Sequence, residues 1–131
     1  WLDLSASSPE MDGYQDQDPF IDKESIKIWG YQYAGENLKH PLASPLYADL
    51  KGLAPILVQI GTSEILLFEN RALYQKAKEQ NLDFMYYEYP EMIHVFQVFG
   101  GFLPQADQAI QQIGSFVMER AKASRQSATT A

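Results

Sequence analysis

The hydrophobic pattern of the chain is clearest over residues 54–61, where an almost continuous apolar run, APILVQIG, ends at Gly61. A short apolar run ended by glycine is typical of a strand buried on both faces of a parallel sheet. Residues 83–89, DFMYYEY, are aromatic and partly alternating, and Pro90 follows them. This second pattern predicts another strand, near a sheet edge.

Two helices are predicted after the first strand. One runs from about Leu67 to Gln80, with a common apolar face of Leu66, Leu73 and Ala77. The other runs from about Pro104 to Ala121, with an apolar face of Ala106, Ile110, Ile113 and Val117, and the polar residues 124–131 are expected to form a disordered tail. Strand, helix, strand, loop and helix make a βαβα unit, so the predicted fold class is α/β with parallel strands.

The first 53 residues carry weaker patterns. Residues 1–4, WLDL, are expected to be the end of a strand, followed by a turn-rich excursion. Asp22 is a candidate N-cap for a helix through about Ala34, with Ile26, Trp29 and Tyr33 on one face and Gly35 as the stop. Residues 36–53, which contain two prolines, predict an extended connection.

The predicted sheet is too small to stand alone. Open sheets usually have about four or more strands, whereas only two strong strands are predicted. A strand that is buried on both faces also needs a neighbour on each side. We therefore expect the sheet to continue in residues outside this sequence, and the start at Trp1, with the first methionine at Met11, points the same way.

The amino-acid composition excludes several kinds of functional site. The absence of cysteine excludes disulfides, zinc–thiolate sites and cysteine nucleophiles. A net charge of −7, from 17 acidic and 10 basic residues, argues against a nucleic-acid surface. No apolar run approaches the roughly 18 to 20 residues that span a bilayer, so a soluble protein without a membrane span is expected.

His94 is the main candidate for chemistry. It lies in the short loop after the second predicted strand, and loops at the carboxyl ends of parallel strands form the ligand crevice of open sheets. This position suits proton transfer, although the same residue is also explained as a polar group on a loop surface. His40 and His94 have no third ligand at a recognisable spacing, so no metal site is predicted.

Glu64 is the favoured partner of His94. It follows the glycine that ends the first strand, and neighbouring parallel strands lie about 5 Å apart, so the two loops can meet. A carboxylate there would fix the tautomer of the histidine. Alternatively, Glu64 is a helix N-terminal acid that the helix dipole stabilises. Glu69 is the rival acid, within the predicted helix start, and Asp49, before the strand, is a more remote one.

A nucleophile is missing from the pattern. Residues 61–65, GTSEI, begin like the nucleophile elbow G-x-S-x-G, but Ile65 stands where the sharp turn needs a small residue. Ser63 is therefore expected to be a turn or N-cap residue. The sequence also contains no HGGG-type oxyanion segment.

Several segments together resemble the C-terminal third of the bacterial hormone-sensitive-lipase-like carboxylesterases, a family of the α/β-hydrolase fold. They are residues 1–4 (WLDL), 18–20 (DPF), 44–50 (SPLYADL), 61–66 (GTSEIL) and 94–97 (HVFQ). The resemblance covers nearly all of residues 1–120. It implies a strand end plus a cap-like excursion over residues 1–43 and the C-terminal portion of a hydrolase core over residues 44–123.

The resemblance implies ester hydrolysis through an acyl-enzyme. In the family the triad acid precedes the histidine by about thirty residues, which places the acid at Glu64 and the base at His94. Most members have aspartate at this position, so Glu69 stays open as the alternative. The nucleophilic serine is then expected in the remaining N-terminal part of the hydrolase, this chain alone is expected to be inactive, and no cofactor is implied.

The resemblance also implies a small ester substrate with a short to medium acyl chain. Candidates for the wall of its pocket are four residues of the cap-like excursion, Phe20, Ile26, Trp29 and Tyr33. Family members often dimerise through their final strand, so a homodimer through strand 83–89 is a further expectation. Its tyrosines, Tyr86, Tyr87 and Tyr89, either line that edge or pack under the last helix.

Two other interpretations remain. One is a non-catalytic ligand-binding module built on a hydrolase fold, against which the presence of His94 argues. The other is an independent structural domain. It predicts cooperative unfolding of the isolated chain, which is not expected of an incomplete sheet.

Overall fold

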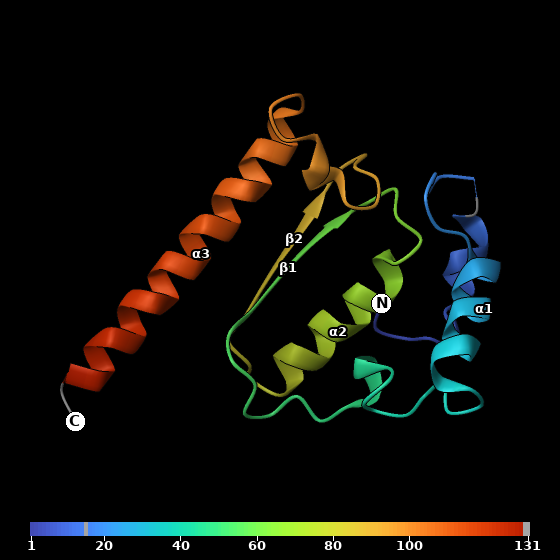
Figure 1. The fold of residues 1–131 in the computed structure, drawn as a ribbon, viewed down its shortest axis with the longest axis horizontal. Coiled ribbons are helices and arrows are strands. Elements are labelled where there is room, and N and C mark those ends of the chain that lie inside the picture. The colour runs from blue at the N-terminus through green and yellow to red at the C-terminus, as the bar shows by residue number, and fades with distance from the viewer. Residues whose placement is uncertain (15, 130–131) are drawn as a thin grey trace. The chain divides into compact units, whose positions relative to one another are not determined.

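A computed structural model describes residues 1–14 and 16–129 of the chain. The chain divides into two compact units, Trp1–His94 and Val95–Ala131. The first unit contains α1 (Lys23–Ala34), β1 (Ile56–Gly61), α2 (Leu67–Glu79) and β2 (Phe84–Tyr89) (Figure 1). The second contains a short 3₁₀ helix, Phe96–Phe99, and α3 (Pro104–Thr129).

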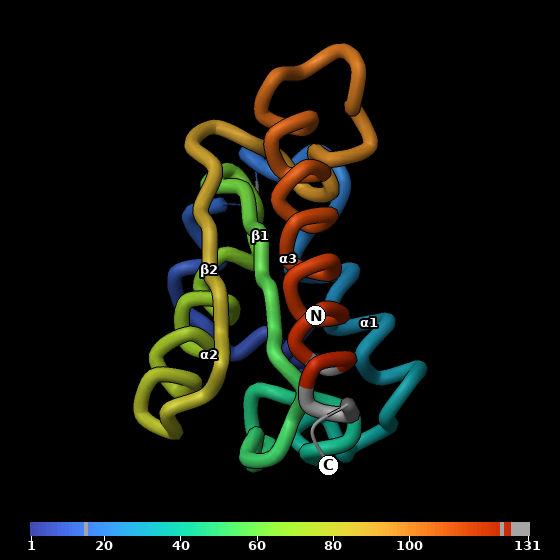
Figure 2. Tube along the Cα trace, turned by 90° about the vertical axis from the view of Figure 1, so that its left-hand side faces the viewer, coloured from blue at the N-terminus to red at the C-terminus, as the bar shows by residue number. Residues whose placement is uncertain are grey.

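The two strands form a parallel pair joined through α2, which confirms the predicted βαβ arrangement and the α/β fold class. Ile56 lies opposite Phe84 at one end, and Gly61 lies opposite Tyr89 at the other. Figure 2 shows β1 and β2 running side by side in the same direction. Within the described residues the sheet has these two strands only.

Helix α1 begins and ends where the sequence predicts. The carboxylate of Asp22 accepts a hydrogen bond from the backbone N–H of Ser25 at 2.8 Å, as an N-cap does. At the other end Gly35 has a φ of 58°, a conformation that glycine adopts at little cost, and it ends the helix.

The buried face of α1 differs from the expected one. Ile26 is fully buried, but Trp29 and Tyr33 are 43% and 75% exposed. The helix instead approaches the N-terminal segment at Gly30, where an added Cβ would lie 2.5 Å from the carbonyl oxygen of Leu4. Positions 26 and 30 are one turn apart, so this close approach rotates Trp29 and Tyr33 out of the core.

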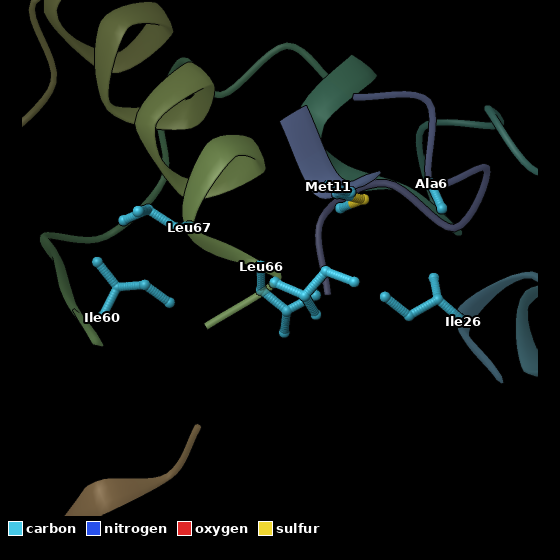
Figure 3. Close-up of a cluster of buried hydrophobic side chains, with 7 residues drawn as sticks. Ala6, Met11, Ile26, Ile60, Leu66 and Leu67 are labelled. Atoms are coloured by element: carbon cyan, nitrogen blue, oxygen red, sulfur yellow. The ribbon is translucent and has the colours of Figure 1, made fainter. Parts of the chain in front are cut away.

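The core of the first unit joins the N-terminal segment, α1, the end of β1 and the start of α2. Its side chains point toward one another in Figure 3. They are Ala6, Met11, Ile26, Ile60, Ile65, Leu66 and Leu67. The predicted apolar face of α2 is confirmed, since Leu66, Leu73 and Ala77 are all buried.

The N-terminal segment does not form the expected strand end. The amides of Leu2 and Asp3 donate to the carboxylate of Glu69, and the amide of Leu4 donates to the hydroxyl of Ser44. Among the described residues no strand pairs with this segment. Its backbone N–H groups therefore donate to side chains and not to the carbonyl groups of a neighbouring strand. Residues 36–53 are likewise not simply extended, because they contain turns and a 3₁₀ helix, Pro45–Tyr47.

Strand β2 turns alternate side chains toward α2. The ring of Tyr86 stacks on that of Tyr74 with centroids 4.6 Å apart, and the ring of Phe84 lies 6.0 Å from the same tyrosine. Tyr86 therefore packs against α2, a partner that the sequence did not predict. Dimerisation through strand 83–89 stays a prediction.

Helix α3 is longer than the sequence predicts. It continues to Thr129, past the expected end near Ala121, so residues 124–129 belong to a helix and not to the expected disordered tail. No glycine or proline follows Gly114, and alanine, lysine, arginine and glutamine are good helix formers. The last two residues of the predicted tail lie outside the described residues. Within the described part of the chain, no helix combines the length and apolar character needed to cross a membrane.

Candidate active site

The carboxyl ends of β1 and β2 bring two loops together, residues 62–66 and residues 90–94. Three hydrogen bonds from backbone N–H groups join residues 62–63 to residues 89–92. The N–H of Thr62 donates to the carbonyl of Tyr89 at 2.9 Å, and the N–H of Ser63 donates to that of Met92 at 3.0 Å. In the other direction, the N–H of Glu91 donates to the hydroxyl of Thr62 at 2.8 Å. The sequence correctly predicted that these loops meet.

Gly61 permits the close approach of the two loops. A Cβ added at this position would overlap the carbonyl oxygen of Met92. A side chain larger than hydrogen would therefore push apart the loops that carry Glu64 and His94. The glycine that marks the end of β1 in the sequence thus has a second role in the packing of the site.

The backbone on either side of His94 is strained. Glu91 and Val95 have φ angles of 61° and 52°, in the left-handed region that residues with a Cβ rarely adopt. Each such residue costs on the order of 1 kcal/mol, and a β-branched residue such as Val95 more. Strain of this kind persists where the surroundings hold it, and it clusters at functional sites.

A hydrogen bond joins Glu64 to His94. The Nδ1 atom of His94 lies 2.9 Å from Oε2 of Glu64. The glutamate side chain is 4% exposed and the imidazole 25% exposed, so the contact is shielded while the histidine still reaches solvent. Because a carboxylate only accepts hydrogen bonds, this contact selects the tautomer with the proton on Nδ1 when the histidine is neutral.

The other oxygen of Glu64 is also bound. The backbone N–H of Gly61 donates to Oε1 at 2.6 Å. With one oxygen on the end of β1 and the other on His94, the carboxylate is fixed at both ends. The glutamate side chain thus reaches both the end of its own strand and the loop that carries His94.

Glu69 lies in a different environment. It is buried in the first turn of α2, where Oε1 accepts from the N–H of Leu2 at 2.7 Å and Oε2 from that of Asp3 at 3.3 Å. Burial raises the pKa of Glu69 to about 7, although these two hydrogen bonds oppose the rise. The structure therefore brings Glu64 to His94 and binds Glu69 to the N-terminal segment.

Three other residues considered from the sequence have local roles. Asp49 is exposed before β1 and accepts from the N–H of Lys51 at 3.1 Å. Ser63 lies in the turn after β1, while Leu66 holds the N-cap position of α2. His40 accepts a hydrogen bond from the N–H of Leu42 through Nδ1 at 3.2 Å.

The four candidates for the pocket wall lie in different surroundings. Ile26 belongs to the buried core, whereas Phe20 is 54% exposed. Trp29 stacks on Trp1 with ring centroids 5.6 Å apart. Tyr33 lines a shallow hollow together with Trp1, Leu4, Ala43 and Pro45.

Asp18 was missed as a contributor to the site. Its Oδ2 accepts a hydrogen bond from the backbone N–H of Ile65, the residue after Glu64, at 3.2 Å. The Asp-Pro pair at residues 18–19 signals a turn, but nothing in the sequence indicates a contact 47 positions away.

Comparisons with known proteins show the family to which the chain is similar. A sequence profile of the α/β hydrolase fold family matches residues 1–98. An acetyl-hydrolase from Streptomyces hygroscopicus is 34% identical over 118 residues. That alignment covers 89% of this chain but 40% of the relative, so the chain spans well under half of the relative's length.

Solved structures are similar over the same part of the chain. An esterase from the bacterial hormone-sensitive lipase family has 40% sequence identity and a TM-score of 0.86, covering 92% of this chain and 41% of its own. EstE5, soaked by p-nitrophenyl butyrate, has 34% identity and a TM-score of 0.84, covering 92% of this chain and 40% of its own. The chain therefore belongs to the α/β-hydrolase family and corresponds to the C-terminal part of the bacterial hormone-sensitive-lipase-like esterases.

Proposed function

We propose that this chain supplies the acid and the base of a serine carboxylesterase, with Glu64 as the acid and His94 as the base. The observation that carries the proposal is the 2.9 Å contact between Nδ1 of His94 and the buried carboxylate of Glu64. A buried carboxylate bound to one ring nitrogen, with the imidazole partly open to solvent, is the arrangement that a hydrolytic triad requires.

His94 would transfer protons through its other ring nitrogen. Nδ1 is held by Glu64, so Nε2 is the atom that takes the proton of a serine hydroxyl as the serine oxygen attacks the ester carbonyl. The same nitrogen then gives that proton to the departing alcohol, which leaves an acyl-enzyme. In the second half of the cycle, Nε2 takes a proton from water and returns it to the serine.

Glu64 would act by orientation and charge. Its bond to the N–H of Gly61 fixes the carboxylate before substrate arrives, and its bond to Nδ1 holds the imidazole in one tautomer. When His94 takes a proton, the carboxylate stabilises the positive ring.

The serine and the oxyanion hole would come from residues that this chain does not contain. The relatives are more than twice as long as the segment that matches, and Ser63, the serine nearest to Glu64, lies in a turn that lacks the elbow pattern. The isolated chain would accordingly hydrolyse no ester above background.

Short acyl esters are the proposed substrates. One relative is called an acetyl-hydrolase, and EstE5 was soaked by p-nitrophenyl butyrate. The exposed aromatic side chains of the cap-like excursion, Phe20, Trp29 and Tyr33, supply apolar surface for such a group. Ile26 would support this surface from the core behind it.

The test uses the complete protein that contains this chain and p-nitrophenyl acetate as substrate. His94→Ala should lower kcat/KM by at least roughly 10⁴-fold, because no other group takes the serine proton. His40→Ala is the matched control and should keep wild-type activity, since the bond of its ring to the N–H of Leu42 stays within its own turn. Activity that survives His94→Ala would refute the assignment, and ligand binding without turnover by the wild type would favour a binding module.

A further inference from the structure

Asp18 connects the cap-like excursion to the loop that carries Glu64. Asp18 is buried, with 6% of the residue exposed, and each of its carboxylate oxygens accepts separate hydrogen bonds. Oδ1 accepts from the N–H groups of Phe20 and Ile21, at 2.9 and 3.2 Å, and closes a turn before α1. Oδ2 accepts from the N–H of Ile65 at 3.2 Å.

The Ile65 amide lies in residues 62–66, the acid loop that carries Glu64, shortly before the start of α2 at Leu67. Ile65 directly follows Glu64, and its side chain is fully buried in the core. On its other side, the acid loop is tied to residues 89–92 through Thr62 and Ser63. The loop is therefore held from two directions, by the His94 loop and by Asp18.

We propose that Asp18 is a positioning residue for the proposed esterase reaction, which fixes the backbone of Glu64 through its hydrogen bond to Ile65. The inference rests on the proposed function of Glu64 and His94. Without Asp18, the residue after Glu64 loses its hydrogen bond to the cap-like excursion, and the Glu64 carboxylate moves relative to the imidazole. A displacement of about 1 Å in a catalytic arrangement can cost on the order of 10²-fold in rate.

Asp18→Asn separates the two functions of this side chain. The amide oxygen replaces Oδ1, which accepts two bonds, so the local turn is kept. The amide nitrogen then faces the N–H of Ile65, and two donors cannot bond to each other. The variant therefore loses the tie to the acid loop and retains the turn.

The kinetic test measures a double-mutant cycle in the complete protein with p-nitrophenyl acetate. Asp18→Asn should lower kcat about 10- to 100-fold with KM within about threefold of wild type. In the background of Glu64→Gln, the same change should alter kcat by less than about threefold, because Asp18 acts through Glu64. Additive losses in the double variant would overturn the proposal, as would an unchanged kcat in the single variant.

A spectroscopic readout tests the same positioning without relying on activity. A proton held between Nδ1 of His94 and a carboxylate resonates far downfield of ordinary amide protons in the NMR spectrum, and its loss in His94→Ala assigns it. Asp18→Asn should weaken or shift this signal. A wild type without esterase activity would remove the proposed function, but a signal altered in Asp18→Asn would still support the positioning role.

Asp22 provides the matched control. It lies in the same excursion and accepts from the N–H and hydroxyl of Ser25, but its bonds stay within α1. Asp22→Ala should lower Tm while leaving kcat and the downfield signal unchanged. If Asp18→Asn and Asp22→Ala changed Tm, kcat and the downfield signal equally, the role of Asp18 would be merely structural and the proposal would be overturned.

If Asp18→Asn unfolds, Asp18→Ser replaces it. The serine hydroxyl can still close the turn to Phe20, but it is too short to keep the bond to Ile65 as well. It should show the same fall in kcat and the same loss of signal, and wild-type values of both would overturn the proposal.

Discussion

Two buried carboxylates lie five positions apart on either side of the start of α2, and their surroundings are different. Glu64 is bound at the strand ends, between the N–H of Gly61 and the ring of His94. Glu69 is bound on the first turn of the helix, between two amides of the N-terminal segment. Burial is similar, at 3% and 2% exposure, so burial alone does not distinguish an acid of the site from a structural one.

The difference lies in what each carboxylate binds. An imidazole can take up and release a proton, so a carboxylate bound to it can assist proton transfer. Backbone amides do neither, so Glu69 fastens residues 2–3 to α2. The contrast also explains why the sequence left both acids open, since their partners lie 30 and more than 60 positions away.

The largest expected effect is on kcat, and it should differ between substitutions of Glu64 and Glu69. Glu64→Gln in the complete protein should lower kcat roughly 10⁴-fold, as loss of the triad carboxylate does in serine hydrolases. Glu69→Gln should keep kcat within about tenfold, because it touches neither His94 nor its loop. Steady-state hydrolysis of p-nitrophenyl acetate measures both, and the reverse ranking would assign the role to Glu69.

A smaller effect is expected from separating the two loops. Gly61→Ala places a methyl group against the carbonyl oxygen of Met92, so it should lower kcat about 10²-fold and destabilise the fold by about 1–3 kcal/mol. Gly13→Ala is the control, because a Cβ there meets nothing within 4 Å. If Gly61→Ala keeps wild-type kcat, the close packing of the loops is not needed for the site.

Glu69 should give the stability a pH dependence of known sign. Its pKa rises from 4.5 unfolded to about 7 folded, so the stability is complete below pH 4.5 and is lost as the pH rises toward 7. The loss is on the order of 3 kcal/mol. We expect the free energy of unfolding of Glu69→Gln, relative to that of the wild type, to be higher at pH 8 than at pH 5. Urea unfolding of both complete proteins at the two pH values measures this difference. An equal difference at both pH values would contradict this.

The smallest expected effect has the opposite pH dependence. Arg71 donates to Glu88 through Nε and Nη2, at 2.8 and 2.7 Å, and these bonds hold the pKa of Glu88 below its ordinary value. This stability is present above the unfolded pKa and is lost as the pH falls through the folded one. Arg71 is 46% exposed, so Glu88→Gln should cost less than about 1 kcal/mol at pH 7 and still less at pH 3. A larger cost at pH 3 would refute the sign.

The elements that local signals define were predicted well. Gly61 and Pro90 end the two strands, and Asp22 and Gly35 delimit α1, because each of these residues acts on its own backbone. The meeting of Glu64 and His94 also followed, since the ends of two neighbouring parallel strands lie at one edge of the sheet.

The features that were missed depend on distant partners. Whether residues 1–4 form a strand depends on a neighbouring strand, and the buried face of α1 depends on its contact at Gly30 with Leu4. The bond from Ile65 to Asp18 likewise joins segments with no shared pattern. The end of α3 was missed for another reason, because residues 121–129 contain no residue that stops a helix.

The most direct test of the central claim is the NMR signal of the His94 Nδ1 proton in the complete protein. The bond to Glu64 predicts a downfield proton signal in the wild type that is lost in Glu64→Gln and retained in Glu69→Gln. A signal that persists in Glu64→Gln, or that disappears in Glu69→Gln alone, would contradict the pairing of Glu64 with His94.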